Sequence, residues 1–188
     1  MNKMLLVIDC QYDFINGSLA VSESEKTMEK LSAFIKENGN EYTIAVATVD
    51  WHPLTHCSFK DNGGVWPVHC LQFSHGASIH QDVLMSLQEY TKNFVVLTKG
   101  CESGHEEYSI FKNAESAEKI KSFVEKFNID EIDVCGIAFD YCVADSCKDG
   151  IAFLPDVSFR VIKELSPAIG DGKEFCDFIS NTEKIEIK

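Results

Sequence analysis

The chain has 188 residues, of which 45 % are hydrophobic and 25 % charged, and this is typical of one soluble globular domain spanning residues 1–188. Its formal net charge of −13 argues against nucleic acid and anionic membranes as partners, because both bind positively charged protein surfaces. No apolar run is long enough to span a membrane and the N-terminal segment lacks the features of a signal peptide, so we expect a cytoplasmic protein.

Segments typical of strands and of helices alternate along the chain. Apolar runs and amphipathic spacing predict, in order, strand 3–8, helix 22–36, strand 42–49, helix 81–89, strand 93–98, helix 114–127, strand 132–138, helix 143–153, strand 159–162, helix 173–179 and strand 184–187. Ser22 and Glu25 have the spacing of a capping box at the first helix. Segments 50–80 and 99–112 lack periodicity, and long irregular segments in compact domains are usually functional.

This alternation, with near-continuous apolar strands, predicts a three-layer α/β/α fold. Its centre would be a mostly parallel, doubly wound sheet of six strands. Ligands bind at the carboxyl ends of the strands in such folds. Four strand ends carry reactive side chains, namely Asp9, Asp50, Lys99 and Cys142, and we expect them to meet at one edge of the sheet.

Cys142 has the most informative position among the eight cysteines, none of which forms a CxxC pair. It follows a buried strand and precedes a helix, with Asp140 as the expected N-cap. The positive end of a helix favours a thiolate, which is a nucleophile. The other cysteines are expected to be small buried side chains in a reducing compartment.

Asp9 and Lys99 supply what such a cysteine needs. A thiol near its reference pKa is mostly protonated at neutral pH, so it requires a base, for which Asp9 is the candidate, and a cation, for which Lys99 is the candidate. Taken singly, each residue has an ordinary structural explanation as a cap, a solvated charge or a buried thiol. Their placement at three strand ends of one sheet favours a catalytic group.

Asp50, His52 and His69 form a second candidate set. One carboxylate and two imidazoles are common ligands of a catalytic zinc, iron or manganese ion. His56 is a competing ligand, and hydrogen bonding within the loop is the alternative role for these histidines. Three aromatic residues of the irregular segments can line a flat pocket for a planar substrate or pack in the core: Phe14, Trp66 and Tyr108.

Five segments together resemble the nicotinamidases of the isochorismatase-like cysteine hydrolase superfamily, in the family's order and over most of the chain. The matching segments are Asp9–Phe14 (D-x-Q-x-D-F), Asp50–Phe59 (D-W-H-P-x-x-H-x-S-F), Gly63–Cys70 (G-G-x-W-P-x-H-C), Lys99–Phe111 (K-G…Y-S-x-F) and Gly136–Val143 (G-x-A-x-D-x-C-V). The chain departs from the family at Phe73, where relatives often have glycine.

The resemblance implies roles for individual residues. It implies a catalytic triad of Asp9, Lys99 and Cys142, and an oxyanion hole of the backbone N–H groups of Ala138 and Cys142 behind a cis peptide. The implied ligands of one divalent metal ion are Asp50, His52 and His69, with Asp61 as the nearest acidic candidate for a further contact and His56 not a ligand. Zinc is the expected ion, with iron or manganese as alternatives. Phe14, Trp66 and Tyr108 would flank the substrate ring.

The implied reaction is hydrolysis of nicotinamide to nicotinate and ammonia through a cysteine thioester, in NAD salvage, with pyrazinamide as a second substrate. A small-molecule substrate and, as an open question, a homo-oligomer are the partners expected. The alternatives are a related amidase acting on another small amide or carbamoyl compound, a binding domain without activity, and a redox sensor. For the last, Cys147 is poorly placed to resolve an oxidised Cys142.

Overall fold

A computed structural model describes residues 1–188, and its centre is a single parallel sheet. The six strands are β1 (Asn2–Ile8), β2 (Ile44–Asp50), β3 (Phe94–Lys99), β4 (Ile129–Gly136), β5 (Ser158–Val161) and β6 (Ile185–Ile187). Their order is β3-β2-β1-β4-β5-β6, and every neighbouring pair is parallel. The predicted doubly wound sheet is therefore confirmed, and it is parallel throughout.

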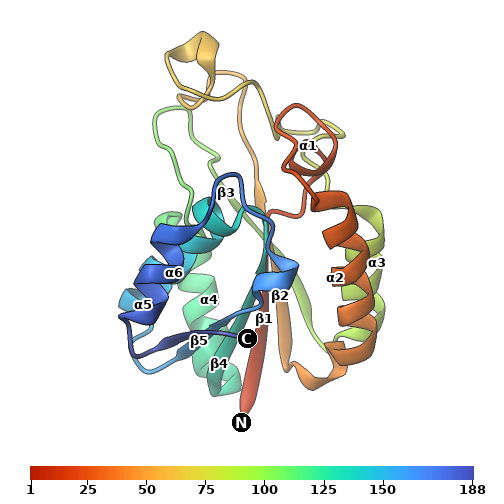
Figure 1. Cartoon of the computed structure of the whole chain (residues 1–188), viewed down its shortest axis with the longest axis vertical. Coiled ribbons are helices and arrows are strands. Elements are labelled where there is room, and N and C mark those ends of the chain that lie inside the picture. The colour runs from red at the N-terminus through yellow and green to blue at the C-terminus, as the bar shows by residue number, and fades with distance from the viewer.

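Helices cover both faces of this sheet (Figure 1). Their bounds are α1 (Tyr12–Ile15), α2 (Ser24–Asn38), α3 (Gln81–Tyr90), α4 (Ala114–Phe127), α5 (Ala144–Phe153) and α6 (Lys173–Ser180). Helices α2 and α3 lie on one face, while α4, α5 and α6 lie on the other, which completes the three predicted layers. None of the helices has the length and apolar character that a membrane crossing requires.

The central strand β1 explains why there are two cores. Its side chains alternate between the faces, so Met4, Leu6 and Ile8 join the core under α4 to α6. Leu5 and Val7 join the core under α2 and α3. A strand buried on both faces has no polar alternation, and this is why β1 reads as a continuous apolar run in the sequence.

The start of α2 differs from the prediction. The capping box of Ser22 and Glu25 is wrong, because the chain enters the helix two residues later through Glu23, whose φ of 62° is left-handed. The hydroxyl of Ser24 donates to the carbonyls of Val21 (2.7 Å) and Ile15 (3.1 Å). The predicted bounds of α4 match the structure, and Asn113 caps it by accepting from the Ser116 N–H at 3.1 Å.

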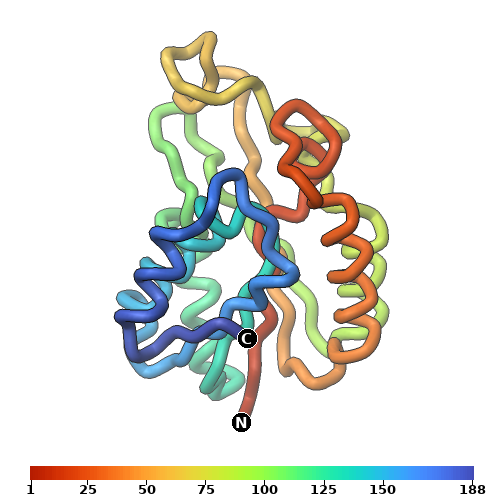
Figure 2. The backbone as a smooth tube through the Cα atoms, viewed as in Figure 1, coloured from red at the N-terminus to blue at the C-terminus, as the bar shows by residue number.

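The sheet directs its carboxyl ends to one end of the molecule. The connections reverse direction between β1 and β4, which makes this the topological switch point where ligands bind in such folds. Segment 51–80, orange to yellow in Figure 2, rises above this end and has no regular structure beyond a 3₁₀ turn at Lys60–Asn62. Segment 100–113 lies beside it in the same views, and its 3₁₀ turn is Ile110–Lys112.

Candidate active site

The four reactive residues of the strand ends meet around one ammonium group. The Nζ of Lys99 lies 2.8 Å from Asp9 Oδ2, 2.5 Å from Asp50 Oδ1 and 3.5 Å from Cys142 Sγ. Asp9 and Lys99 are fully buried, and Asp50 and Cys142 are at most 6 % exposed. Each residue comes from the end of a different strand or from the turn after it, as the parallel topology requires.

Local backbone geometry aims the Asp9 carboxylate. Asp9 has a φ of 48°, uncommon for a residue with a side chain, directly after β1. Its N–H donates to the Thr48 carbonyl at 3.2 Å, and the Thr48 hydroxyl donates to Asp9 Oδ1 at 2.5 Å. The other carboxylate oxygen, Oδ2, is thereby directed to Lys99.

One ammonium between two carboxylates gives these acids different proton affinities. Burial raises the pKa of Asp9 more than the charge of Lys99 lowers it. Burial also acts on Asp50, but Lys99 and His52 outweigh it and the pKa of Asp50 is lowered. Burial lowers the pKa of Lys99, yet the two carboxylates raise it well above its usual value, so Lys99 stays charged. Asp9 is therefore the more basic carboxylate and the better proton acceptor.

Cys142 is a thiol in the free protein. Burial, with the charges of Asp9 and Asp50, raises its pKa well above the usual value despite the charge of Lys99. The expected stabilisation of a thiolate by the helix end is therefore outweighed. Cys142 lies in a π-helical turn, Phe139–Val143, that precedes α5. Asp140 is not the N-cap that the sequence predicts, because its carboxylate accepts from the N–H groups of Ile169 and Gly170 instead.

Asp50, His52 and His69 gather beside this group, with ligand atoms all within 4.8 Å of one another. The Nδ1 of His52 lies 2.8 Å from the Gly100 carbonyl, and the Nδ1 of His69 lies 2.8 Å from the Pro67 carbonyl. A carbonyl only accepts, so both Nδ1 atoms carry the proton and both Nε2 atoms offer a lone pair. The buried Nε2 of His52 has no hydrogen-bond partner and lies 3.5 Å from Asp50 Oδ2. This donor set fits a divalent cation.

The remaining metal candidates lie differently. Both ring nitrogens of His56 are engaged, with Nε2 donating to the His105 carbonyl (3.0 Å) and Nδ1 accepting from the Ser58 hydroxyl (2.7 Å). Burial and the neighbouring His52 lower the pKa of His56 to about 4, so it is neutral. Asp61 is exposed on the 3₁₀ turn and outside the ligand cluster. The carboxylate beside His52 is that of Glu106, within 4.8 Å.

Residues of the first loop hold the ligand loop in place. The side-chain amide of Gln11 donates to the carbonyls of Asp50 (2.8 Å) and Ala77 (2.9 Å), and its oxygen accepts from the Asp50 N–H at 2.8 Å. The Asp13 carboxylate accepts from the N–H of Cys70, next to His69, at 2.7 Å. These bonds join both ends of segment 51–80 to the loop after β1.

Glycine is required at position 100. Gly100 has a φ of +63°, and a Cβ there would lie 2.3 Å from Cε1 of His52. The close approach lets the Gly100 carbonyl bind His52, and the Gly100 N–H donates to the Glu107 carboxylate at 2.6 Å.

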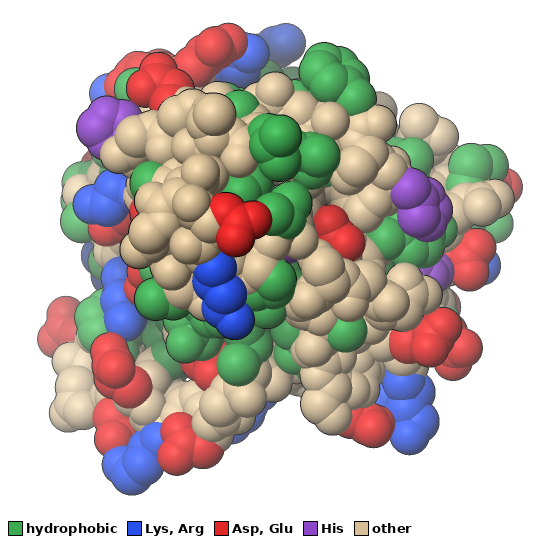
Figure 3. Space-filling model, turned by 90° about the horizontal axis from the view of Figure 1, so that it is seen from above, with side chains coloured by type: hydrophobic (Ala, Val, Ile, Leu, Met, Phe, Trp, Pro, Cys, Tyr) green, Lys and Arg blue, Asp and Glu red, His purple; other side chains and the backbone are tan.

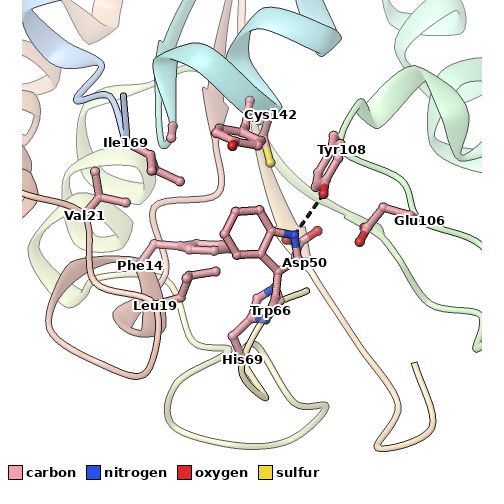
Figure 4. A pocket seen from close by; sticks show the side chains of 12 residues that line it. Phe14, Leu19, Val21, Asp50, Trp66, His69, Glu106, Tyr108, Cys142 and Ile169 are labelled. Atoms are coloured by element: carbon pink, nitrogen blue, oxygen red, sulfur yellow. Dashed lines mark hydrogen bonds between the residues drawn. The ribbon is translucent and has the colours of Figure 1, made fainter. Parts of the chain in front are cut away.

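A pocket with about 380 Å³ of empty space opens above Cys142 and Asp50 (Figure 4). Phe14, Trp66 and Tyr108 line it, and the Trp66 indole N–H donates to the Tyr108 hydroxyl at 2.9 Å. Figure 3, viewed onto this end of the molecule, shows hydrophobic side chains near the centre with acidic ones beside them. A small, mostly apolar pocket with a few polar groups suits a small planar ligand.

Ala138 also lines this pocket, next to the nucleophile turn. The peptide bond between Ile137 and Ala138 is cis, at the position that the resemblance implies. The N–H of Ala138 has no hydrogen-bond partner within the chain and is therefore available to a ligand oxygen.

The family model described as Isochorismatase domain matches residues 3–169. The chain belongs to the isochorismatase family. A curated relative, the nicotinamidase of Saccharomyces cerevisiae, is 30 % identical over 169 residues that cover 75 % of this chain and 77 % of that protein. The isochorismatase-like fold predicted from the sequence is thereby confirmed.

Two solved structures resemble this isochorismatase-family protein over all of its length. The pyrazinamidase of Pyrococcus horikoshii in complex with zinc has a TM-score of 0.86 at 27 % identity, covering 100 % of this chain and 99 % of that one. PnC1 from L. infantum in complex with nicotinate also has a TM-score of 0.86, at 28 % identity, covering 100 % of this chain and 92 % of that one.

Several pocket residues of this isochorismatase-family chain escaped the reading of its sequence: Leu19, Val21, Glu106, Tyr141 and Ile169. All of them lie outside the predicted strands and helices, and only the irregularity of segment 99–112 pointed to one of them, Glu106. At the departure from the family, Phe73 has a φ of 65° and is 88 % exposed, a conformation that glycine adopts at lower cost.

Proposed function

We propose that the protein is a nicotinamidase, which hydrolyses nicotinamide to nicotinate and ammonia, and that pyrazinamide, a close isostere, is a second substrate. The observation that carries the proposal is the Lys99 ammonium in contact with Asp9 and Cys142, beside Asp50, His52 and His69 in an aromatic pocket. The S. cerevisiae relative, named a nicotinamidase, supports the same substrate.

In this proposal the ring lies among Phe14, Trp66 and Tyr108, with its carboxamide carbon at Cys142 Sγ. Asp9 takes the thiol proton, and Lys99 stabilises the thiolate as its sulfur attacks that carbon. The N–H groups of Ala138 and Cys142 hold the oxygen that becomes negatively charged.

The carbon–nitrogen bond then breaks, and Asp9 returns its proton to the leaving ammonia. Water attacks the thioester with Asp9 as the base, so that nicotinate leaves and the thiol is restored. The raised pKa of Asp9 suits this double role, because it must accept and release one proton in each half of the cycle.

Asp50, His52 and His69 would hold one divalent cation, and its contribution is to bind the ring nitrogen and orient the ring. We propose zinc, because the donor set is one carboxylate and two imidazoles and the P. horikoshii pyrazinamidase binds zinc. Iron and manganese accept the same ligands and are the alternatives.

Ammonia release from nicotinamide tests the proposal directly. Wild type and Cys176→Ala are expected to be active, since Cys176 lies on α6 outside the pocket, and Cys142→Ala is expected to be inactive. Full activity of Cys142→Ala would refute the nucleophile. An inactive wild type that contains metal would instead favour an amidase with another substrate.

Metal content tests the ligand set separately. The double variant His52→Ala, His69→Ala is expected to lose the metal, whereas His105→Ala, with an exposed side chain, is expected to retain it. Equal metal in both variants, measured by mass spectrometry of the purified proteins, would refute the assignment.

A further inference from the structure

The pocket has two chemically different sides, seen in Figure 4. The side chains of Asp50 and Glu106 lie on one side, together with the Tyr108 hydroxyl. The other side is aliphatic and consists of Leu19, Val21 and Ile169. A ring bound between these sides must therefore direct its polar atoms and its C–H edge in opposite directions.

Ile169 differs from the other two aliphatic residues. Val21 is 6 % exposed and belongs to the core under α2, and Leu19 packs against that core. Ile169 is 46 % exposed and belongs to neither core. Its side chain has no role in holding the fold together, so its position at the pocket must be set by its backbone.

The backbone of Ile169 is tied to the turn that carries Cys142. The carboxylate of Asp140 accepts from the N–H of Ile169 at 2.9 Å and from the N–H of Gly170 at 2.6 Å. The Phe139 N–H donates to the Pro167 carbonyl at 2.9 Å. Hydrogen bonds to a carboxylate are stronger than neutral ones, so segment 167–170 is held at a fixed distance from the nucleophile turn.

We propose that Ile169 determines specificity by limiting substituents on the ring edge that faces away from the polar side, and that Asp140 is the positioning residue that holds it there. The inference rests on the proposed function. In a pyridine-3-carboxamide, the carboxamide carbon lies at Cys142 and the nitrogen faces the polar side. Ring position 5 is then the position directed at the aliphatic side, whereas position 2 lies between Cys142 and Asp50.

The test compares 5-methylnicotinamide with nicotinamide in the metal-loaded enzyme. In Ile169→Ala, the ratio of their kcat/KM values is expected to rise about tenfold, the effect of one methyl group in an apolar pocket. The ratio for 2-methylnicotinamide is expected to stay the same, because position 2 does not face Ile169. Ile187→Ala, an equally exposed isoleucine on β6, is the matched control and is expected to change neither ratio.

Binding gives a readout that does not depend on catalysis. Calorimetry with nicotinate and 5-methylnicotinate is expected to show the same shift toward the methylated ligand in Ile169→Ala. Asp140→Asn, which keeps one accepting oxygen and the side-chain volume, is expected to move both ratios in the same direction because it loosens segment 167–170.

Each outcome decides something. Unchanged ratios in an Ile169→Ala enzyme that hydrolyses nicotinamide would overturn the specificity role alone. A change in Ile169→Ala without one in Asp140→Asn would overturn the positioning role of Asp140. A wild type that neither hydrolyses nicotinamide nor binds nicotinate would overturn the proposed function, and this inference with it.

Discussion

Replacing Lys99 with methionine removes the one ammonium shared by two buried carboxylates. Lys99 is fully buried, and its Nζ lies 2.8 Å from Asp9 and 2.5 Å from Asp50. Methionine fills most of the same volume, so the change tests charge and not packing. Removing one partner of a buried ion pair costs about 3–5 kcal/mol. A domain of this size loses about 2–4 °C for each kcal/mol, so Tm should fall by roughly 6–20 °C.

Thermal unfolding in the presence of a chelator measures this cost without a contribution from metal. We expect Lys99→Met to be least stable at neutral pH and to recover in mild acid, where Asp9 takes up a proton and relieves the repulsion from Asp50. Adding Asp9→Asn to Lys99→Met should restore part of the loss, with a coupling of about 0.5–3 kcal/mol, but no hydrolysis. Lys112→Met is the control, because Lys112 is 63 % exposed and its ion pair with Asp149 is 3.4 Å long.

The reasoning fails if Lys99→Met unfolds at the temperature of Lys112→Met. It also fails if Asp9→Asn costs as much in the Lys99→Met protein as in wild type, since the two residues would then not interact.

Three further predictions follow from the same electrostatics and packing. Activity should fall as pH drops through the pKa of Asp9, which burial raises above its usual value, and a pH–rate profile that stays flat down to about pH 4 would contradict this. Gly100→Ala should lower stability by about 1–3 kcal/mol and weaken metal binding, because the new methyl group clashes with His52; urea unfolding and metal titration measure both. Burial alone would raise the pKa of Asp133, but hydrogen bonds from Arg160, Lys188 and Tyr42 hold it below the usual value. Asp133 therefore stabilises the fold above its unfolded-state pKa and loses this effect as pH falls through the lower folded value, so Asp133→Asn should cost stability at neutral pH and approach wild type in strong acid.

The order of strands and helices follows from the sequence because each signal is local. Strand β2 is buried along its whole length and reads as an apolar run, and α4 begins and ends where its amphipathic pattern does. The start of α2 does not follow, although Ser22 and Glu25 have suitable spacing. Ser24 instead binds the carbonyl of Ile15, and this contact depends on how the first loop folds back.

The site divides in the same way. Parallel topology alone places Asp9, Asp50 and Lys99 at one edge of the sheet, so their proximity can be predicted without side-chain detail. Glu106 and Ile169 come from irregular segments whose paths depend on single hydrogen bonds, such as the one that the Gly100 N–H donates to Glu107. No periodicity encodes such bonds, so the pocket walls cannot be read from the sequence.

The protonation state of Cys142 shows most clearly what a sequence omits. A helix N-terminus lowers the pKa of a thiol, and that contribution is visible from residue order. Desolvation acts in the opposite direction, and its size depends on how deeply the sulfur is buried and on the two carboxylates nearby. In the structure these effects win, so Cys142 rests as a thiol. Its activation must then come from the transfer of its proton to Asp9 while Lys99 remains charged, which makes the nucleophile dependent on both partners and not on the helix.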